Sequence, residues 1–376
     1  MIEIDRLLPA KTAKFVKSQI KLNLKKSKHA YRWGLDDKLF ALSIFYHSRR
    51  SYYILRQLFA LPSKRTLLRT LQRTNIVPGF NSQIFDALKV RVDTFDEKDR
   101  QCVIVFDEMS LKSYVEYNPQ GDFIEGLENF GGTNQTKKVA NHALAFMVRG
   151  LASKWKQPLC YFLTSGPVSA QDLQSLVKSC VEKLPGIGLS VKAMICDQGS
   201  NNRSFVETLE KVSLAKPYII YGDEKVFVFY DPPHLLKNIR NNFMKHGFLY
   251  NGVPIQWQYI VQFYTFDKAN NIRMAPKLSE KHVTLPPFTA MRVNLAAQVM
   301  SHSVAAGLST LSHANKLPAD AEHTAQFIEN FDQLFNAFNS GSLKSHQKMR
   351  HALSEKSGHK DFLEKKSFIF EPSHPK

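Results

Sequence analysis

The stretch CVIVFD at residues 102–107 decides how this sequence folds, together with its counterpart VKAMICD at residues 191–197. Each is a short, mostly apolar run that stops at an aspartate, which is typical of a buried strand. An acid at the end of such a strand emerges at the edge of a sheet, where the active sites of α/β proteins lie. Asp107 and Asp197 could therefore share a divalent cation. The alternative is that they only end strands or cap helices.

The segments around these two runs predict an α/β protein. Three strands come first, and helices and strands then alternate. This order predicts a mixed sheet with helices on its faces, which is the ribonuclease-H-like plan. In that plan the strands that end at Asp107 and Asp197 are neighbours. The expected strands are 102–107, 142–149, 158–164, 190–196 and 225–230, and the expected helices are 169–184, 203–213 and 234–245.

Three further polar residues follow the ends of expected strands. Glu108 would point to the opposite face from Asp107, and we interpret it as a solvent-exposed or capping residue. Asp231 precedes two prolines, and we interpret it as the cap of the next helix rather than a metal ligand. For His234 we expect a hydrogen bond to a neighbouring side chain, with a contact to phosphate or metal as the alternative.

The composition excludes several classes of protein. The chain has 376 residues, of which 43% are hydrophobic, so two or three globular domains are expected. No apolar run approaches the roughly eighteen residues that span a bilayer, and the N-terminus lacks a signal-peptide core. We therefore expect an intracellular protein without a membrane partner. The four cysteines form no C-x-x-C pair, so neither a disulfide framework nor a zinc site is expected.

Positive charge is concentrated near the N-terminus. Residues 6–80 contain 17 lysines and arginines and two acids, a net charge of +15 out of +18 for the whole chain. Such a concentration indicates a polyanionic partner, because lysine and arginine neutralise phosphates and release their counterions. The alternative is a solvated basic surface.

A basic segment at 9–30 and three short helices are expected in this region. The helices are predicted at 36–47, at 51–59 and after Ser63, which is a natural N-cap. In the third helix three leucines would face the other helices and the cations would face outward, which predicts a DNA-binding module like a helix-turn-helix. A plain helical bundle is the alternative. The leucines are Leu67, Leu68 and Leu71, and the cations are Lys64, Arg65, Arg69 and Arg73.

After about residue 255 the strand signals fade. Apolar helices are expected at 289–311 and 320–338, which indicates a second, all-helical domain or an insertion. The residues from 340 onward are rich in serine, lysine and histidine, without an expected closing element. The predicted regions are a basic helical region 1–92, a ribonuclease-H-like core 100–250, a helical domain 251–345 and a polar tail 346–376.

Seven segments in succession resemble the P-element-type DNA transposases and their THAP-domain relatives. The resemblance covers most of residues 30–340. It implies a ribonuclease-H-like catalytic core interrupted by a mainly helical insertion that binds GTP as an assembly cofactor. The segments are FDEMSLK (106–112), TKKVANHALAFMVRGL (136–151), VKAMICDQGSNNRS (191–204), FYDPPHLLKNIRNNF (229–243), APKLSEKHV (275–283), RVNLAAQVMSHSVAAGL (292–308) and FDQLFNAFNS (331–340).

The resemblance implies that Asp107 and Asp197 are two of three catalytic carboxylates that hold Mg²⁺, or Mn²⁺, for DNA cleavage and strand transfer. The third is a glutamate that follows the insertion in the family. No residue here matches it, and we expect the sequence to stop inside the insertion. The N-terminal THAP zinc finger of the family has no match either.

The resemblance also implies a GTP site in the helical domain. Cations would meet the phosphates, an aromatic ring would stack on the base, and amides would meet its edge. The family typically has an aspartate where this sequence has Asn336, and an amide offers guanine only one acceptor oxygen and no charge. The matching positions are Lys277, Arg292, Val293, Ser301, Phe335, Asn336 and Asn339.

The leading interpretation is a fragment of a P-element-like DNA transposase. It would act in the nucleus on transposon ends and target DNA, as a homo-oligomer, with Mg²⁺ and GTP. One alternative is a domesticated, catalytically inactive DNA- or chromatin-binding protein. Another is a GTP-binding regulatory module.

Overall fold

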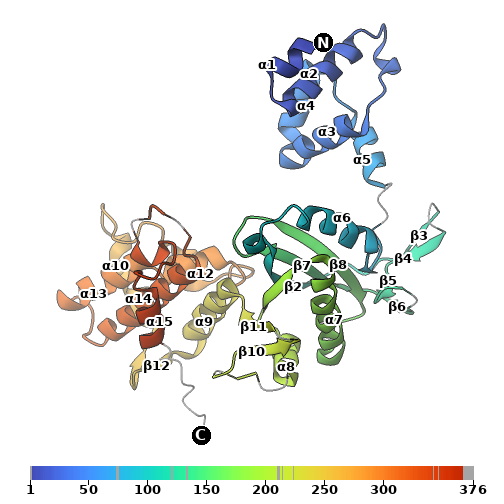
Figure 1. The fold of residues 1–376 in the computed structure, drawn as a ribbon. Helices are drawn as coiled ribbons and strands as arrows, with labels where there is room; N and C mark the ends of the chain where they lie inside the picture. Colours follow the sequence, from blue (N-terminus) through green and yellow to red (C-terminus); the bar gives the residue numbers. More distant parts are fainter. Residues whose placement is uncertain are drawn as a thin grey trace. The chain divides into compact units, whose positions relative to one another are not determined.

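The computed structural model describes residues 2–72, 76–119, 122–132, 134–209, 212–213, 215–222, 224–341, 343–345 and 347–366. It divides into two compact units, Met1–Val77 and Pro78–Lys376 (Figure 1). No helix among these residues is both long and apolar enough to cross a bilayer.

The first unit is helical. Its helices are α1 (Ile2–Leu7), α2 (Ala10–Asn23), α3 (Leu35–His47), α4 (Arg49–Leu58) and α5 (Lys64–Gln72). The last three are the helices that the sequence predicts. Ser63 caps α5 as expected, because its Oγ accepts the backbone N–H of Thr66 at 3.2 Å.

Aromatic and apolar side chains hold the first unit together. Phe45 and Tyr52 are buried with Leu67 in one cluster, and Phe15 of α2 packs against it. The prediction for Leu68 is wrong, since this side chain is 39% exposed. Successive helical residues turn by about 100°, so the face of α5 that buries Leu67 carries Leu71 at i+4 and turns Leu68 outward.

The second unit contains a nine-stranded mixed sheet in the order β10-β11-β9-β2-β7-β8-β5-β6, with β1 also paired to β8. β2 runs parallel to β9 and antiparallel to β7, and β9 runs parallel to β11. This topology confirms the mixed α/β sheet that the sequence predicts. The strands are β1 (Gly79–Phe80), β2 (Gln101–Ser110), β5 (Leu127–Asn129), β6 (Gln135–Val139), β7 (His142–Gly150), β8 (Lys156–Thr164), β9 (Ser190–Cys196), β10 (Tyr218–Tyr221) and β11 (Glu224–Tyr230).

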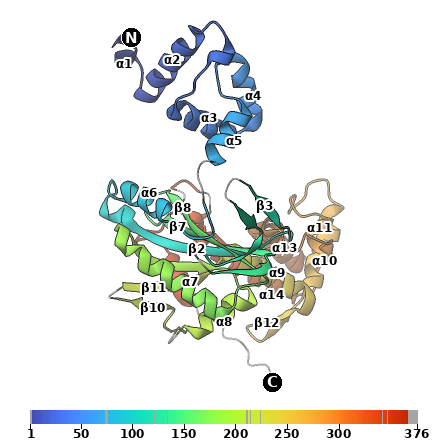
Figure 2. The same cartoon turned by 90° about the vertical axis from the view of Figure 1, so that its right-hand side faces the viewer.

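Three helices pack on this sheet: α6 (Ser82–Val92), α7 (Ala170–Lys183) and α8 (Ser200–Thr208). Helices α7 and α8 lie side by side (Figure 2), and Phe205 of α8 meets Phe106 of β2 edge-on. Helix α6 falls in the second unit, because Leu88 and Val92 are buried in the core of the sheet. A small hairpin of β3 (Glu116–Asn118) and β4 (Phe123–Glu125) lies in a segment where the sequence predicts no strand.

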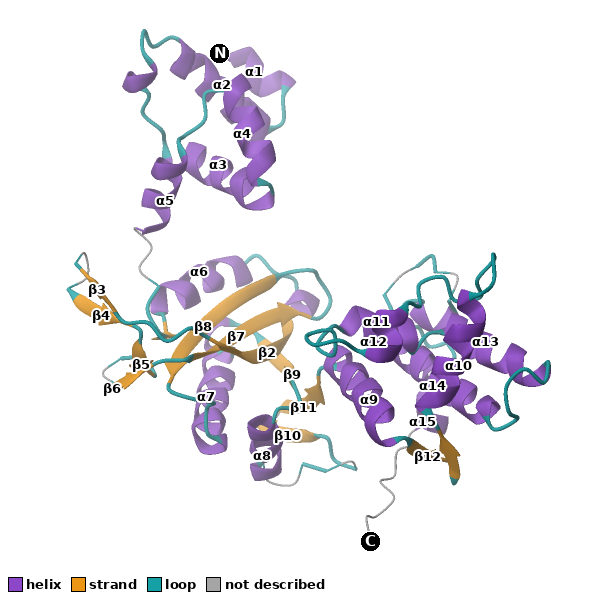
Figure 3. Ribbon diagram, turned by 180° about the vertical axis from the view of Figure 1, so that it is seen from behind, coloured by secondary structure: helices purple, strands orange, loops and turns teal. Residues whose placement is uncertain are grey.

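A helical domain with its own core follows the sheet along the chain, and Figure 3 shows its helices grouped together with β12. Phe243 of α9 is buried in this core, so α9 packs with the helical domain although it follows β11 directly. The elements are α9 (Pro232–His246), β12 (Phe248–Tyr250), β13 (Val253–Ile255), α10 (Trp257–Lys268), α11 (Glu280–Thr284), α12 (Val293–Val299), α13 (His302–His313), α14 (Ala321–Phe338), a 3₁₀ helix (Lys348–Arg350) and α15 (His359–Lys366).

Two expectations for this domain are wrong. The single helix expected at 289–311 is two helices, because Ser301 has extended backbone (φ −123°, ψ 153°) and starts α13 as its N-cap. The tail expected to lack a closing element contains α15. His359 at its start is 2% exposed, and its Nε2 lies 2.9 Å from the carbonyl oxygen of Met349.

Candidate functional site

Asp107 and Asp197 lie level on neighbouring parallel strands. Val105 of β2 pairs with Ile195 of β9, and each aspartate follows two residues later. Neighbouring strands are about 4.8 Å apart, and residues two apart point to the same face. The two aspartates therefore share one edge and one face of the sheet, although 90 residues separate them in the sequence.

The loop after β9 fixes the carboxylate of Asp197. Its Oδ1 accepts the backbone N–H of Gly199 at 2.8 Å and the side-chain amide of Asn202 at 2.6 Å. Both donors belong to the start of α8, so the loop and the helix orient the carboxylate from one side. The other oxygen, Oδ2, accepts no hydrogen bond from the described residues.

Asp107 is exposed near the end of β2. Its Oδ1 accepts the backbone N–H of Glu108 at 2.9 Å. Two aspartates with free oxygens fit Mg²⁺, which commonly takes one or two carboxylates and keeps several waters. Among the described residues, no group of three or more histidine, cysteine, aspartate or glutamate side chains is close enough to hold an ion.

Glu108 is half-buried and lies beside this pair. Its Oε1 accepts the backbone N–H of Val168 at 3.2 Å, just before α7. Burial raises the pKa of Glu108, and the charges of Asp107 and Asp197 add to this rise. The interpretation of Glu108 as a solvent-exposed residue is therefore wrong. Its position near both aspartates was not predicted, because it depends on the packing of α7.

Asp231 occupies the corresponding position on the third parallel strand. Tyr230 of β11 pairs with Cys196, and the N–H of Asp231 donates to the carbonyl of Cys196 at 2.8 Å. Its carboxylate caps α9 and accepts the N–H of His234 at 3.2 Å, while Nδ1 of His234 lies 2.5 Å from Oδ2. This confirms the capping interpretation and the side-chain hydrogen bond expected for His234.

The residues predicted to bind GTP lie on several elements of the helical domain. Lys277 and Arg292 are exposed, before α11 and at the start of α12. Ser301 is the N-cap residue of α13, but its side chain does not cap the helix, because its Oγ donates to the carbonyl of Gln298 at 2.9 Å. Asn336 is buried and lines a cavity of about 630 Å³. The lining of this cavity does not include the other six: Lys277, Arg292, Val293, Ser301, Phe335 and Asn339.

Asp332 lines the same cavity one helical turn before Asn336 and was not predicted from the sequence. Its Oδ2 accepts the side-chain amide of Asn336 at 2.8 Å. Burial raises the pKa of Asp332 to about 6, and the nearby charge of Glu329 also raises it. Nδ1 of His302 lies 2.8 Å from Glu329, and this bond raises the pKa of His302.

Three of the four predicted DNA-binding residues lie exposed on α5. Lys64, Arg65 and Arg69 form no ion pair with any described residue. Arg73 lies outside the described residues. These three side chains are exposed, as the sequence predicts for the outer side of this helix.

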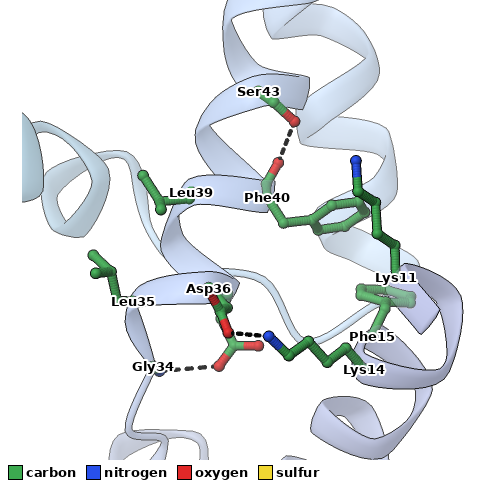
Figure 4. Close-up of a pocket in the computed structure, with 10 residues that line it drawn as sticks. Lys11, Lys14, Phe15, Gly34, Leu35, Asp36, Leu39, Phe40 and Ser43 are labelled. Atoms are coloured by element: carbon green, nitrogen blue, oxygen red, sulfur yellow. Dashed lines mark hydrogen bonds and ion pairs between the residues drawn. The ribbon is translucent and has the colours of Figure 1, made fainter. Parts of the chain in front are cut away.

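The first unit also contains a recess, which is lined by residues of α2 and α3 rather than by the exposed cations of α5. Figure 4 shows Lys14 reaching from α2 to Asp36 at the start of α3, with 2.6 Å between Nζ and Oδ2. This bond raises the pKa of Lys14. The rings of Phe15 and Phe40 line the recess with centroids 5.1 Å apart. Since Lys14 is already paired with an acid, the recess is a poorer phosphate site than α5.

Comparison with protein families matches two segments of the chain. Residues 76–210 match the TNP-like, RNase H N-terminal domain. Residues 233–351 match the TNP-like, GTP-binding insertion domain. The first segment includes both aspartates, and the second includes the cavity-lining residues Asp332 and Asn336.

Two curated proteins are similar over most of the chain. The Transposable element P transposase of Drosophila melanogaster is 26% identical over 330 residues, which cover 87% of this chain and 41% of that protein. The DNA transposase THAP9 of Homo sapiens is 27% identical over 361 residues, covering 89% of this chain and 38% of that protein. The chain therefore spans about two fifths of the length of these relatives.

A solved structure has the same architecture. The Drosophila P element transposase strand transfer complex aligns with a TM-score of 0.78 and 25% sequence identity. The alignment covers 97% of this chain and 80% of that chain.

Proposed function

This chain is a relative of the P-element and THAP9 transposases, and we propose from this premise that it binds DNA and contributes two carboxylates to a metal-dependent transposase site. The reaction would be phosphodiester cleavage followed by strand transfer. The observation that carries the proposal is the level position of Asp107 and Asp197 on β2 and β9.

Asp107 and Asp197 would hold Mg²⁺, which would offset the negative charge that develops on the phosphate oxygens. Asn202 and the N–H of Gly199 hold one oxygen of Asp197 and leave the other for the ion. Asp231 would not share the ion while it caps α9.

The first unit would supply the DNA contacts. Lys64, Arg65 and Arg69 project from the exposed side of α5, and the cations of this region greatly outnumber its acids. Phosphate contacts of this kind bind DNA regardless of sequence and position it for the chemistry. Action on genomic DNA would place the protein in the nucleus, and transposon ends and target DNA would be its substrates.

The helical domain would bind GTP, consistent with its match to a GTP-binding insertion domain. GTP would act as a cofactor for assembly into a homo-oligomer. Arg292 and Lys277 are exposed cations suited to phosphates, and Asn336 lines a cavity large enough for a base.

Nicking of supercoiled plasmid in the presence of Mg²⁺ or Mn²⁺ tests the catalytic part. We expect nicking by the wild-type chain, loss in Asp107→Asn and Asp197→Asn, and retention in Asp86→Asn, which changes an exposed acid on α6. Equal nicking by the wild type and the three variants would show that Asp107 and Asp197 do not form the catalytic site. DNA binding without nicking by the wild type would instead favour an inactive DNA-binding protein.

A further inference from the structure

A cavity of the first unit is lined by the segment that follows α2, by α4 and by the start of α5. Its volume is about 860 Å³, within the range of ligand-binding pockets. We call it the aromatic pocket, and none of its described lining residues is acidic. It is separate from the recess of Figure 4, which contains Asp36. Its aromatic and polar lining includes Asn23, His29, Tyr31, Trp33, Tyr53 and Arg56.

The rings of this pocket are only partly used by the core of the unit. Tyr52 is fully buried, and its hydroxyl donates to the carbonyl of Pro62 at 2.5 Å. Tyr53, the next residue of α4, is 43% exposed, and its hydroxyl has no hydrogen-bond partner among the described residues. Tyr31 and Trp33 are half-buried and meet edge-on, with ring centroids 5.7 Å apart. Ring faces therefore remain for a ligand.

Hydrogen bonds hold the backbone of the pocket in place. Nη1 of Arg32 donates to the carbonyls of His29 and Tyr31, both at 3.1 Å, and so fixes the segment that carries two of the rings. The side chain of Gln19 donates to the carbonyl of Ala60 at 2.9 Å and accepts its N–H at 2.8 Å. A pocket that is already ordered loses little conformational entropy when a ligand binds.

The charge around the pocket decides which ligand suits it. Aromatic rings can bind a cation, but no described lining residue supplies an acid, and residues 6–80 carry a net charge of +15. Arg56 lines the pocket and forms no ion pair with a described residue. The pocket therefore suits a ligand that combines flat apolar faces with negative charge, as nucleotides do.

We propose that the aromatic pocket binds unpaired nucleotides of DNA, with bases stacked on Trp33 and Tyr53 and a phosphate at Arg56. The proposal rests on the proposed DNA binding and adds a single-stranded substrate to the duplex contacts of α5. In a duplex both faces of each base are covered by neighbouring bases, so only an unpaired base offers a face to these rings. Ser63 and Thr66 belong to the lining, so the pocket adjoins the first turn of α5.

Fluorescence anisotropy on the full chain tests this proposal. The probes are a labelled oligothymidylate of about twelve nucleotides, within the site sizes of proteins that bind single strands, and a blunt duplex. Tyr53→Ala should weaken oligothymidylate binding about fivefold or more, because one stacked base loses its platform, and should leave duplex affinity unchanged. Tyr53→Phe keeps the ring and should bind as the wild type does.

Tyr46→Ala is the matched control, since it removes a tyrosine that is 66% exposed on α3 and does not line the pocket. Tryptophan fluorescence gives a second readout, because Trp155 and Trp257 are only 4% and 9% exposed. Oligothymidylate should quench the emission of the wild type, and this quenching should disappear in Trp33→Phe. Thermal melting should show that all the variants fold.

Two results would overturn the assignment of the pocket. One is an equal oligothymidylate affinity in Tyr53→Ala and Tyr46→Ala, and the other is quenching that persists in Trp33→Phe. Tighter binding of an oligouridylate of the same length would assign the pocket to RNA and contradict the proposal. A wild type that binds the duplex but not the oligothymidylate would overturn this proposal alone. Binding of neither would overturn the proposed DNA binding as well.

Discussion

The side-chain amide of Asn202 donates to Oδ1 of Asp197 at 2.6 Å and so ties the candidate metal ligand to helix α8. A group that orients a ligand contributes to metal affinity without touching the ion. Asn201, the preceding residue, donates instead to the carbonyl of Val168 at 2.8 Å. Substituting each of these neighbouring asparagines in turn therefore distinguishes an effect on the candidate metal site from an effect on the fold.

Asn202→Ala should weaken Mn²⁺ binding by about tenfold, because the Asp197 carboxylate loses a partner that fixes its orientation. Asn201→Ala should lower stability and leave Mn²⁺ affinity unchanged. Isothermal titration of both variants measures this difference. Equal affinities in Asn202→Ala and the wild type would show that α8 does not position Asp197.

Asp231→Ala should lower the free energy of unfolding by about 1 kcal/mol, because α9 loses its N-cap. Asp231→Asn should cost much less, since asparagine caps helices about as well as aspartate. Urea unfolding measures both values. A large loss of Mn²⁺ affinity in Asp231→Asn, with stability preserved, would instead identify Asp231 as a metal ligand.

Asp332→Asn should stabilise the protein at pH 7. Burial raises the pKa of Asp332 to about 6, from an ordinary value of 3.8, so the folded chain binds this proton more tightly than the unfolded chain. The stability contributed by this residue therefore falls as the pH rises from about 4 to about 6. Allowing for solvent screening at a site that is only partly buried, the gain at pH 7 should be about 1–2 kcal/mol.

Other side chains near Asp332 also influence how its protonation affects stability. They are Glu329 and Asn336 of α14, His302 of α13, and the cavity-lining Lys348, His351 and His359. The variant and the wild type should become equally stable near pH 4, where Asp332 is protonated in the folded state. A stability difference that stays constant from pH 4 to pH 7 would show that the carboxylate charge is not its cause.

Arg65→Glu and Arg69→Glu should each weaken DNA binding and reduce its dependence on salt, because each removes a phosphate contact from α5. Lys21→Glu, at an exposed position on α2, is the control with the same change of charge. Fluorescence anisotropy with a duplex at several salt concentrations measures the slope. An equal loss in all three variants would indicate general attraction to the basic unit rather than a contact surface on α5.

The strands that carry the candidate metal site could be predicted because each is a mostly apolar run that ends at an acid. The pairing of Val105 with Ile195 follows from the order of elements. Strand β10 was missed, because it has only four residues and Ile220 within it is 60% exposed. Its place in the sheet depends on pairing with β11, which is not a local signal.

Other features depend on tertiary packing and leave no local pattern. The run from Val293 to Val304 contains no glycine or proline, yet the helix breaks at Ser301. Asp332 reads as an ordinary polar residue of an amphipathic helix. Asp332 lies in a cavity only because the segment that carries His359 folds back toward α14.

The most direct test of the metal site is Mn²⁺ binding to the full chain, followed by electron paramagnetic resonance. We predict that Asp107→Asn and Asp197→Asn each abolish or strongly weaken binding of the same ion. The double variant should lose little more affinity than either single variant, because ligands of one ion do not act independently. Asp86→Asn should bind as the wild type does. Wild-type affinity in either single variant, or additive losses from two separate ions, would contradict a shared site at the edge of the sheet.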